Sequence, residues 1–121
     1  MSQTNDGIKA FIATETLVAF TRVMLTSGSG TAVELADATD GAGYIGTTTV
    51  DAAIGENVSI QLKSSGRTTK MKAGGAVVVG ADVFATDDGK IDDSDPGSGV
   101  LIGKALEPAS GAGSVIEVIE L

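Results

Sequence analysis

Hydrophobic and polar residues alternate in short runs along this chain, and glycines or Asp-Gly pairs separate most of these runs. Short alternating runs bounded by turn residues are typical of β-strands that are half-buried. Such runs predict strands near residues 20–25, 31–35, 44–51, 57–63, 67–73, 76–79 or 82–86, 89–91, 100–107 and 114–120. A single helical turn is an alternative for residues 73–76. The pattern therefore predicts an all-β protein.

The longest apolar-rich stretch without glycine covers residues 8–25, and its period is ambiguous. Ile8, Phe11 and Ile12 fit one face of a helix, whereas residues 20–25 alternate as a strand does. We therefore predict an extended N-terminal arm over residues 1–19 and a strand from about residue 20. An ordinary first strand or helix, packed on the protein's own core, is the alternative for the apolar part of the arm.

An internal repeat organises the rest of the sequence. Residues 44–46, Tyr-Ile-Gly, return as residues 101–103, Leu-Ile-Gly, and a glycine turn and a further strand follow each copy. Upstream, residues 22–33 match residues 82–91 as strand, turn and strand. Self-similarity of a glycine-punctuated β unit points to a scaffold or a binding protein.

We infer one β domain over residues 20–121, with pseudo-repeats at about 20–62 and 81–121 and a basic connector at 63–80. The expected fold is a small glycine-rich β-barrel or tulip-like sandwich, because closure removes the exposed edges of a sheet. Valine and isoleucine together number 21 against 7 leucines, and aromatic residues make up 3% of the chain. The core must therefore be filled by small aliphatic side chains, and assembly could supply additional stability.

The composition excludes several classes of chemistry. Cysteine and histidine are absent, so disulfides, thiolate chemistry and a serine–histidine pair are excluded. The net charge of −8 is the wrong sign for binding nucleic acid. No secretory pattern or apolar stretch of membrane-spanning length is present, so no membrane contact is expected.

Two motifs suggest a ligand site, and neither is complete. Residues 41–46 satisfy G-x-G-x-x-G, but the residues that follow favour a strand over the helix that a dinucleotide site needs. Residues 87–95 are rich in aspartate but lack the spacing of a calcium-binding loop. The acidic residues lie mainly in turns, where solvent keeps them ionised and not adapted to acid–base catalysis. We therefore expect no catalytic residues, no metal site, no cofactor and no small-molecule substrate.

Positive charge is concentrated in residues 61–80, which contain four cations and no acid, namely Lys63, Arg67, Lys70 and Lys72. One interpretation is a basic patch that meets an acidic partner. The other is a connector whose cations are neutralised by the acids of the protein itself.

Several short motifs resemble the small capsid cement, or head decoration, proteins of tailed bacteriophages. Ala-Gly-Gly-Ala-Val at 73–77 leads to a Gly-Ala-Asp-Val and Asp-Gly-Lys-Ile progression at 80–91, then Ile-Gly-Lys-Ala-Leu at 102–106 and a closing strand at 116–121. The resemblance spans about residues 20–121. Ala81 departs from the family pattern, which places glycine directly before aspartate, and this affects only the local turn.

The resemblance implies a non-enzymatic virion protein that is made in the host cytoplasm and binds the outside of the expanded capsid. Such proteins usually form homotrimers that clamp neighbouring subunits of the major capsid protein against the pressure of the packaged DNA. In the predicted arm, the candidate contact residues are Ile8, Phe11, Ile12, Leu17 and Val18. The four cations of the connector form a second candidate contact.

The alternative function is a carbohydrate- or cell-surface-binding β module of a phage fibre or adhesin. Such a module needs exposed aromatic rings to stack on sugars, and this chain has one tyrosine and no tryptophan.

Overall fold

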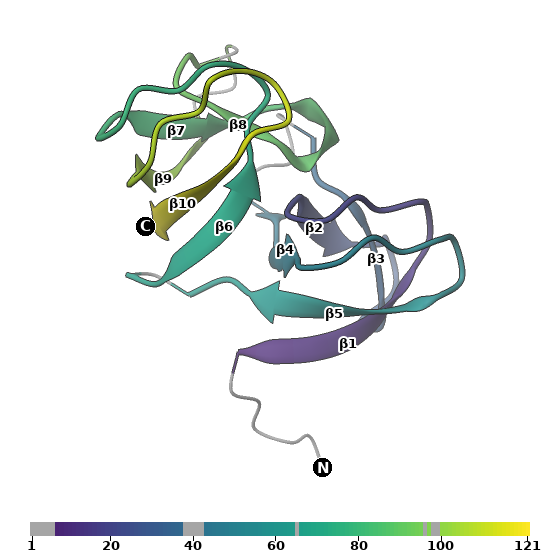
Figure 1. Cartoon of the computed structure of the whole chain (residues 1–121). Helices are drawn as coiled ribbons and strands as arrows, with labels where there is room; N and C mark the ends of the chain where they lie inside the picture. The colour runs from purple at the N-terminus through teal and green to yellow at the C-terminus, as the bar shows by residue number, and fades with distance from the viewer. Residues whose placement is uncertain (1–6, 38–42, 65, 96, 98–99) are drawn as a thin grey trace.

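The computed structural model describes residues 7–37, 43–64, 66–95, 97 and 100–121. Within these residues the chain is all-β, as predicted, and its strands form two sets of five (Figure 1). The first set is β1 (Ile8–Ala13), β2 (Arg22–Leu25), β3 (Ala32–Leu35), β4 (Gly46–Thr48) and β5 (Asn57–Leu62). The second set is β6 (Thr68–Lys72), β7 (Asp82–Ala85), β8 (Ile91–Asp92), β9 (Leu101–Ala105) and β10 (Val115–Glu120).

The first set closes into a barrel with the strand order β1-β3-β2-β4-β5. Antiparallel pairing joins β1 to β5, β5 to β4, β4 to β2 and β2 to β3, and a short parallel pairing of β1 with β3 closes the circle. The predicted small β-barrel is therefore confirmed.

The second set repeats this topology. Its order is β6-β10-β9-β7-β8, and a parallel bridge between Ala73, just after β6, and Ile91 in β8 stands where β1 meets β3 in the first set. Each strand of the first set thus has a counterpart with the same neighbours, so the sequence repeat is a duplicated five-stranded unit.

The repeat is longer than the sequence analysis inferred. β1 lies in the predicted arm and β6 in the predicted connector, and these two strands are counterparts that begin their respective halves. The interpretation of residues 8–13 as an arm is therefore wrong, and the alternative of an ordinary first strand is correct. Residues 1–6 lie outside the described part of the chain.

The two cores are built from matching positions. In the first half the buried residues are Phe11, Ala13, Leu17, Val23, Val33, Ala52, Val58 and Ile60. Their counterparts in the second half are Met71, Ala73, Val77, Val83, Ile91, Ala109, Ile116 and Val118, and all of these are buried. The small aliphatic core that the composition predicted is therefore present twice.

The halves share part of one core. Ala36 and Tyr44 belong to the first half by sequence, yet both are buried in the cluster of the second half, where the partly buried Met24 also packs. The backbone N–H of Lys72 also donates to the carbonyl of Phe20 at 2.7 Å. The two units are therefore packed together.

The turns also correspond between the halves. Phe20 has a φ of 64°, and its counterpart Gly80 has a φ of 83°. A bulky residue in this left-handed region is strained, and glycine is not. Between β7 and β8, the turn η2 (Asp87–Gly89) has positive φ at Asp88 and Gly89, so this Asp-Gly pair forms the turn that connects the two strands. No helix forms at residues 73–76, and of the two alternatives for the next strand the one near 82–86 is correct.

One glycine in each half allows two strands to approach closely. A Cβ at Gly46 would lie 2.3 Å from the carbonyl oxygen of Gln61, and a Cβ at Gly103 would lie 2.0 Å from that of Ile119. Both distances are far below van der Waals contact, and the obstacle is backbone that is fixed by strand pairing. The Ile-Gly motif of the repeat thus marks the same close contact twice.

Gly103→Ala should lower the free energy of unfolding by at least about 2 kcal/mol, because the added methyl group must push β10 away from β9. Urea unfolding followed by circular dichroism measures the change. Gly111→Ala is the matched control, because a Cβ there meets nothing within 4 Å, and it should change stability by less than about 0.5 kcal/mol. Equal effects of the two substitutions would contradict the close-contact explanation.

Candidate functional site

The structure divides the predicted contact residues of the first segment into two groups. Phe11 and Leu17 are buried in the first barrel and cannot meet a partner while it is closed, so their assignment as contact residues is corrected. Ile8, Ile12 and Val18 expose 56%, 44% and 42% of their surface. The residues of β1 differ in burial because side chains alternate along a strand, so that Phe11 points inward and Ile12 points outward.

The four cations of the predicted basic patch have different surroundings. Lys63 has its Nζ 4.4 Å from the centre of the Tyr44 ring, and Arg67 donates from Nη1 to the carbonyl of Leu62 at 3.0 Å. Lys70 lies on the exposed side of β6 opposite Glu117 of β10. Lys72, by contrast, lines a cavity of about 350 Å³ between the two halves.

Arg22 of β2 is a junction residue that the sequence analysis did not find. It is fully buried, and its Nη2 donates to the carbonyl oxygens of Thr86 at 2.8 Å and of Lys90 at 2.9 Å, both in the second half. Gly89 packs against the Arg22 backbone so closely that a Cβ there would lie 2.6 Å from its carbonyl oxygen. Burial lowers the pKa of Arg22 to about 10, so the side chain remains a cation at neutral pH. One buried cation therefore fastens the hairpin around η2 to the first barrel.

Tyr44 and Glu120 form a second buried contact at the junction. The Tyr44 hydroxyl donates to Oε2 of Glu120, and the guanidinium carbon of Arg22 lies 5.6 Å from the centre of the Tyr44 ring. Burial raises the pKa of Tyr44 and also raises that of Glu120, because the charged form of either side chain would lose its hydration. These groups bond one another across the junction, so they hold the two halves together.

Two neighbouring loops project from the end of each half. We call residues 14–20 with 49–56 the first loop pair, and residues 74–80 with 106–113 the second loop pair. Paired backbone hydrogen bonds join the loops of each pair, between Leu17 and Ala52 in the first and between Val77 and Ala109 in the second. In Figure 1 the first loop pair lies at the right of the molecule, and the second lies along the top.

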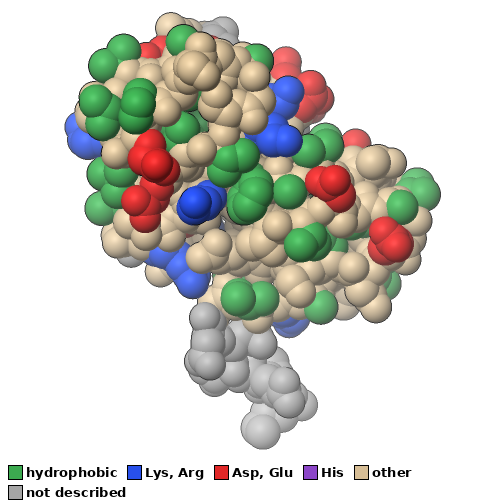
Figure 2. All heavy atoms as spheres, viewed as in Figure 1, with side chains coloured by type: hydrophobic (Ala, Val, Ile, Leu, Met, Phe, Trp, Pro, Cys, Tyr) green, Lys and Arg blue, Asp and Glu red, His purple; other side chains and the backbone are tan. Residues whose placement is uncertain are grey.

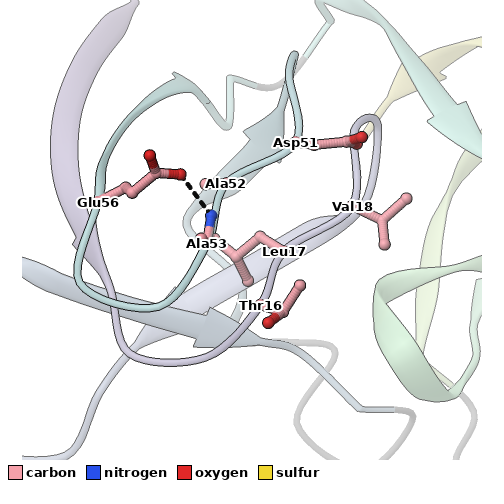
Figure 3. Close-up of a pocket in the computed structure, with 7 residues that line it drawn as sticks. All are labelled: Thr16, Leu17, Val18, Asp51, Ala52, Ala53 and Glu56. Atoms are coloured by element: carbon pink, nitrogen blue, oxygen red, sulfur yellow. Dashed lines mark hydrogen bonds between the residues drawn. The ribbon is translucent and has the colours of Figure 1, made fainter.

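The first loop pair encloses a shallow pocket of about 260 Å³ (Figure 3). Its floor is apolar, and Asp51 and Glu56 stand on opposite sides of it. Glu56 accepts a hydrogen bond from the backbone N–H of Ala53 at 2.6 Å, and Asp51 accepts one from that of Ala19 at 2.8 Å. The pocket is suited to holding an apolar side chain.

The structure gives no support to ligand chemistry at the other motifs. Among the described residues, no group of three acidic side chains converges on a point that could hold a metal ion. Gly46 of the G-x-G-x-x-G motif begins strand β4, while Gly41 and Ala42 lie outside the described residues. In the same described part of the chain, no helix has the length and apolar character needed to cross a membrane.

Comparison with known proteins identifies the family. The family model for phage cement proteins matches residues 2–119, which is nearly the whole sequence. This chain belongs to the phage cement protein family. The match begins before the first strand, so it also covers the segment that the sequence resemblance did not include.

A solved structure shows the same fold as this cement protein. The head fibre gp8.5 N base of bacteriophage phi29 superposes with a TM-score of 0.73 at 18% sequence identity, over 94% of this chain and 92% of that one. No curated protein matches the sequence significantly. The family match favours a structural phage protein over an adhesin or a nucleotide-binding enzyme.

Arg22→Met should lower the free energy of unfolding by about 1–3 kcal/mol, because it leaves the Thr86 carbonyl without its side-chain donor and removes one of the two donors of the Lys90 carbonyl, which also accepts from the N–H of Thr86. Chemical denaturation measures this loss. Lys104→Met is the control, since Lys104 pairs with Asp82 on the exposed surface at 3.1 Å, and such a pair contributes at most about 1 kcal/mol. A loss no larger than the control's would mean that Arg22 does not fasten the halves.

Glu120→Gln should be more stable than the wild type, and the difference in the free energy of unfolding should grow as the pH rises from 4.5 towards 8. A raised pKa of Glu120 means that the folded state holds the proton more tightly than the unfolded state, so wild-type stability falls as pH rises through the folded-state pKa. Glutamine still accepts from Tyr44 and has no charge to bury. Unfolding measured across this pH range, with Glu117→Gln on the outer face of the same strand as control, tests the sign. A difference that is independent of pH would contradict it.

Proposed function

We propose that this cement protein binds the outer surface of the expanded phage head and holds neighbouring major capsid subunits together, so that the head withstands the internal pressure of its DNA. The observation that carries the proposal is the family match over residues 2–119. The role is structural, with no catalytic turnover and no cofactor.

The architecture supports this role. A small barrel and a five-stranded sheet share a buried junction, so the protein can transmit force between two ends of its own structure. A protein that binds the assembled lattice and not its separate subunits stabilises the lattice by mass action. Several weak contacts made at once also multiply in strength, because the first contact raises the effective concentration of the others.

Homotrimer formation is part of the proposal. Three copies around a threefold position of the head would multiply the contacts with the lattice. Sedimentation equilibrium of the free protein, and of protein released from heads, measures the association state.

The purified protein should cosediment with expanded heads that lack it and should not cosediment with unexpanded heads, because expansion creates the arrangement of subunits that it bridges. Saturated heads should also release their DNA at a higher temperature than bare heads, which a dye that fluoresces on DNA can report. Failure to bind expanded heads would refute the proposal. Binding to host cells in place of heads would support the adhesin alternative.

A further inference from the structure

Each loop pair exposes large apolar side chains, and one of these positions is shared by the two halves. Val18 in the first pair and Val78 in the second are counterparts in the repeat, and they expose 42% and 66% of their surface. The other exposed apolar residues of the loops are Val50 and Ile54 in the first pair and Val79 and Leu106 in the second. Large exposed apolar side chains gathered on loops are typical of surfaces that become covered by a partner.

Carboxylates accompany these apolar residues in both places. Asp51 and Glu56 flank the first pocket, and backbone N–H groups hold both of them. At the second loop pair, Asp93 accepts from the N–H of Val78 at 3.0 Å, and Glu107 accepts from that of Glu117 at 2.7 Å. Neither loop pair contains a lysine or an arginine. Hydrophobic and acidic side chains lie side by side over both halves on the face shown in Figure 2.

This chemistry specifies the partner surface. Apolar side chains beside fixed carboxylates complement an apolar segment that is flanked by lysine or arginine. The same combination occurs in two halves of one chain, so the two surfaces suit two copies of the same target. A capsid lattice offers such copies, because its neighbouring subunits are chemically identical.

We propose that the two loop pairs are equivalent docking sites, each of which binds the same kind of segment, apolar and flanked by Lys or Arg, on one of two neighbouring capsid subunits. This inference rests on the proposed function and adds where the contact is made and what it recognises. The buried junction holds the two sites at a fixed separation. Binding at one site therefore places the other site near its target, and the second contact costs little additional entropy.

Serine substitutions at exposed positions test the sites without disturbing either core. Val50→Ser with Ile54→Ser removes apolar surface from the first loop pair, and Val78→Ser with Val79→Ser removes it from the second. The control is Leu101→Ser with Leu121→Ser, which removes apolar residues of comparable exposure, 42% and 56%, outside the loops. Circular dichroism and thermal unfolding verify that each variant is folded before its binding to expanded heads that lack the protein is measured by sedimentation.

Either loop variant should weaken binding to the heads by about 100-fold or more, because one contact replaces two, and the combined variant should not bind. The control should bind as the wild type does. Asp51→Asn with Glu56→Gln keeps the acceptors of the backbone hydrogen bonds but removes the charge, so it should reduce the dependence of binding on salt concentration.

The outcomes separate this inference from the proposed function. If wild-type protein does not bind expanded heads, both are overturned. If the wild type binds and the loop variants bind equally well, or if only the Leu101 and Leu121 variant binds weakly, the proposed function stands and the docking sites are wrong. Loop variants that change the association state of the free protein while binding heads normally would place the loops between copies of this chain and would also overturn the inference.

Discussion

The rest of the structure depends on the burial of Arg22 between the two halves. A buried cation is costly unless its donors are satisfied. Nη2 of Arg22 donates to the carbonyl oxygens of Thr86 and Lys90, whereas Nε and Nη1 have no hydrogen-bond partner among the described residues. The contact is directional, so it fixes the orientation of the barrel against the second sheet as well as their distance. It acts together with the shared core of Ala36, Tyr44 and Met24 and with the contact between Tyr44 and Glu120.

A fixed junction changes what a duplicated protein can do. Two identical units on a flexible tether can bind two targets at many separations, whereas two units in one rigid body select a single separation. Under the proposed function, a single separation would favour the lattice whose neighbouring subunits have the matching spacing. The internal repeat supplies two similar units, and the buried junction fixes the distance between them.

The sequence predicted the all-β class and most strands because glycines mark their ends. It did not predict β1, and it predicted β6 as a strand but assigned it to the connector rather than to the second half. In β1 the apolar Ile8 and Ile12 face outward while Phe11 faces inward, which obscures the period of two. In β6 the counterparts are mostly polar, and only buried positions such as Met71 reveal the relationship. The strand pairing shows that β1 and β6 are counterparts, although their exposed residues do not resemble each other.

The junction and the docking surfaces could not be predicted from local patterns for a different reason. Arg22 has Asp82 as its counterpart in the repeat, yet Arg22 is buried and the Asp82 side chain is half exposed. The two positions diverged because one faces the other half and its counterpart faces solvent, and no local pattern shows that difference. The exposed apolar residues of the loops resemble core residues in a sequence, since only the paired bonds between loops show that Leu17 is turned inward and Val18 outward. The junction and the proposed docking sites therefore depend on which way side chains point, and only the fold shows this.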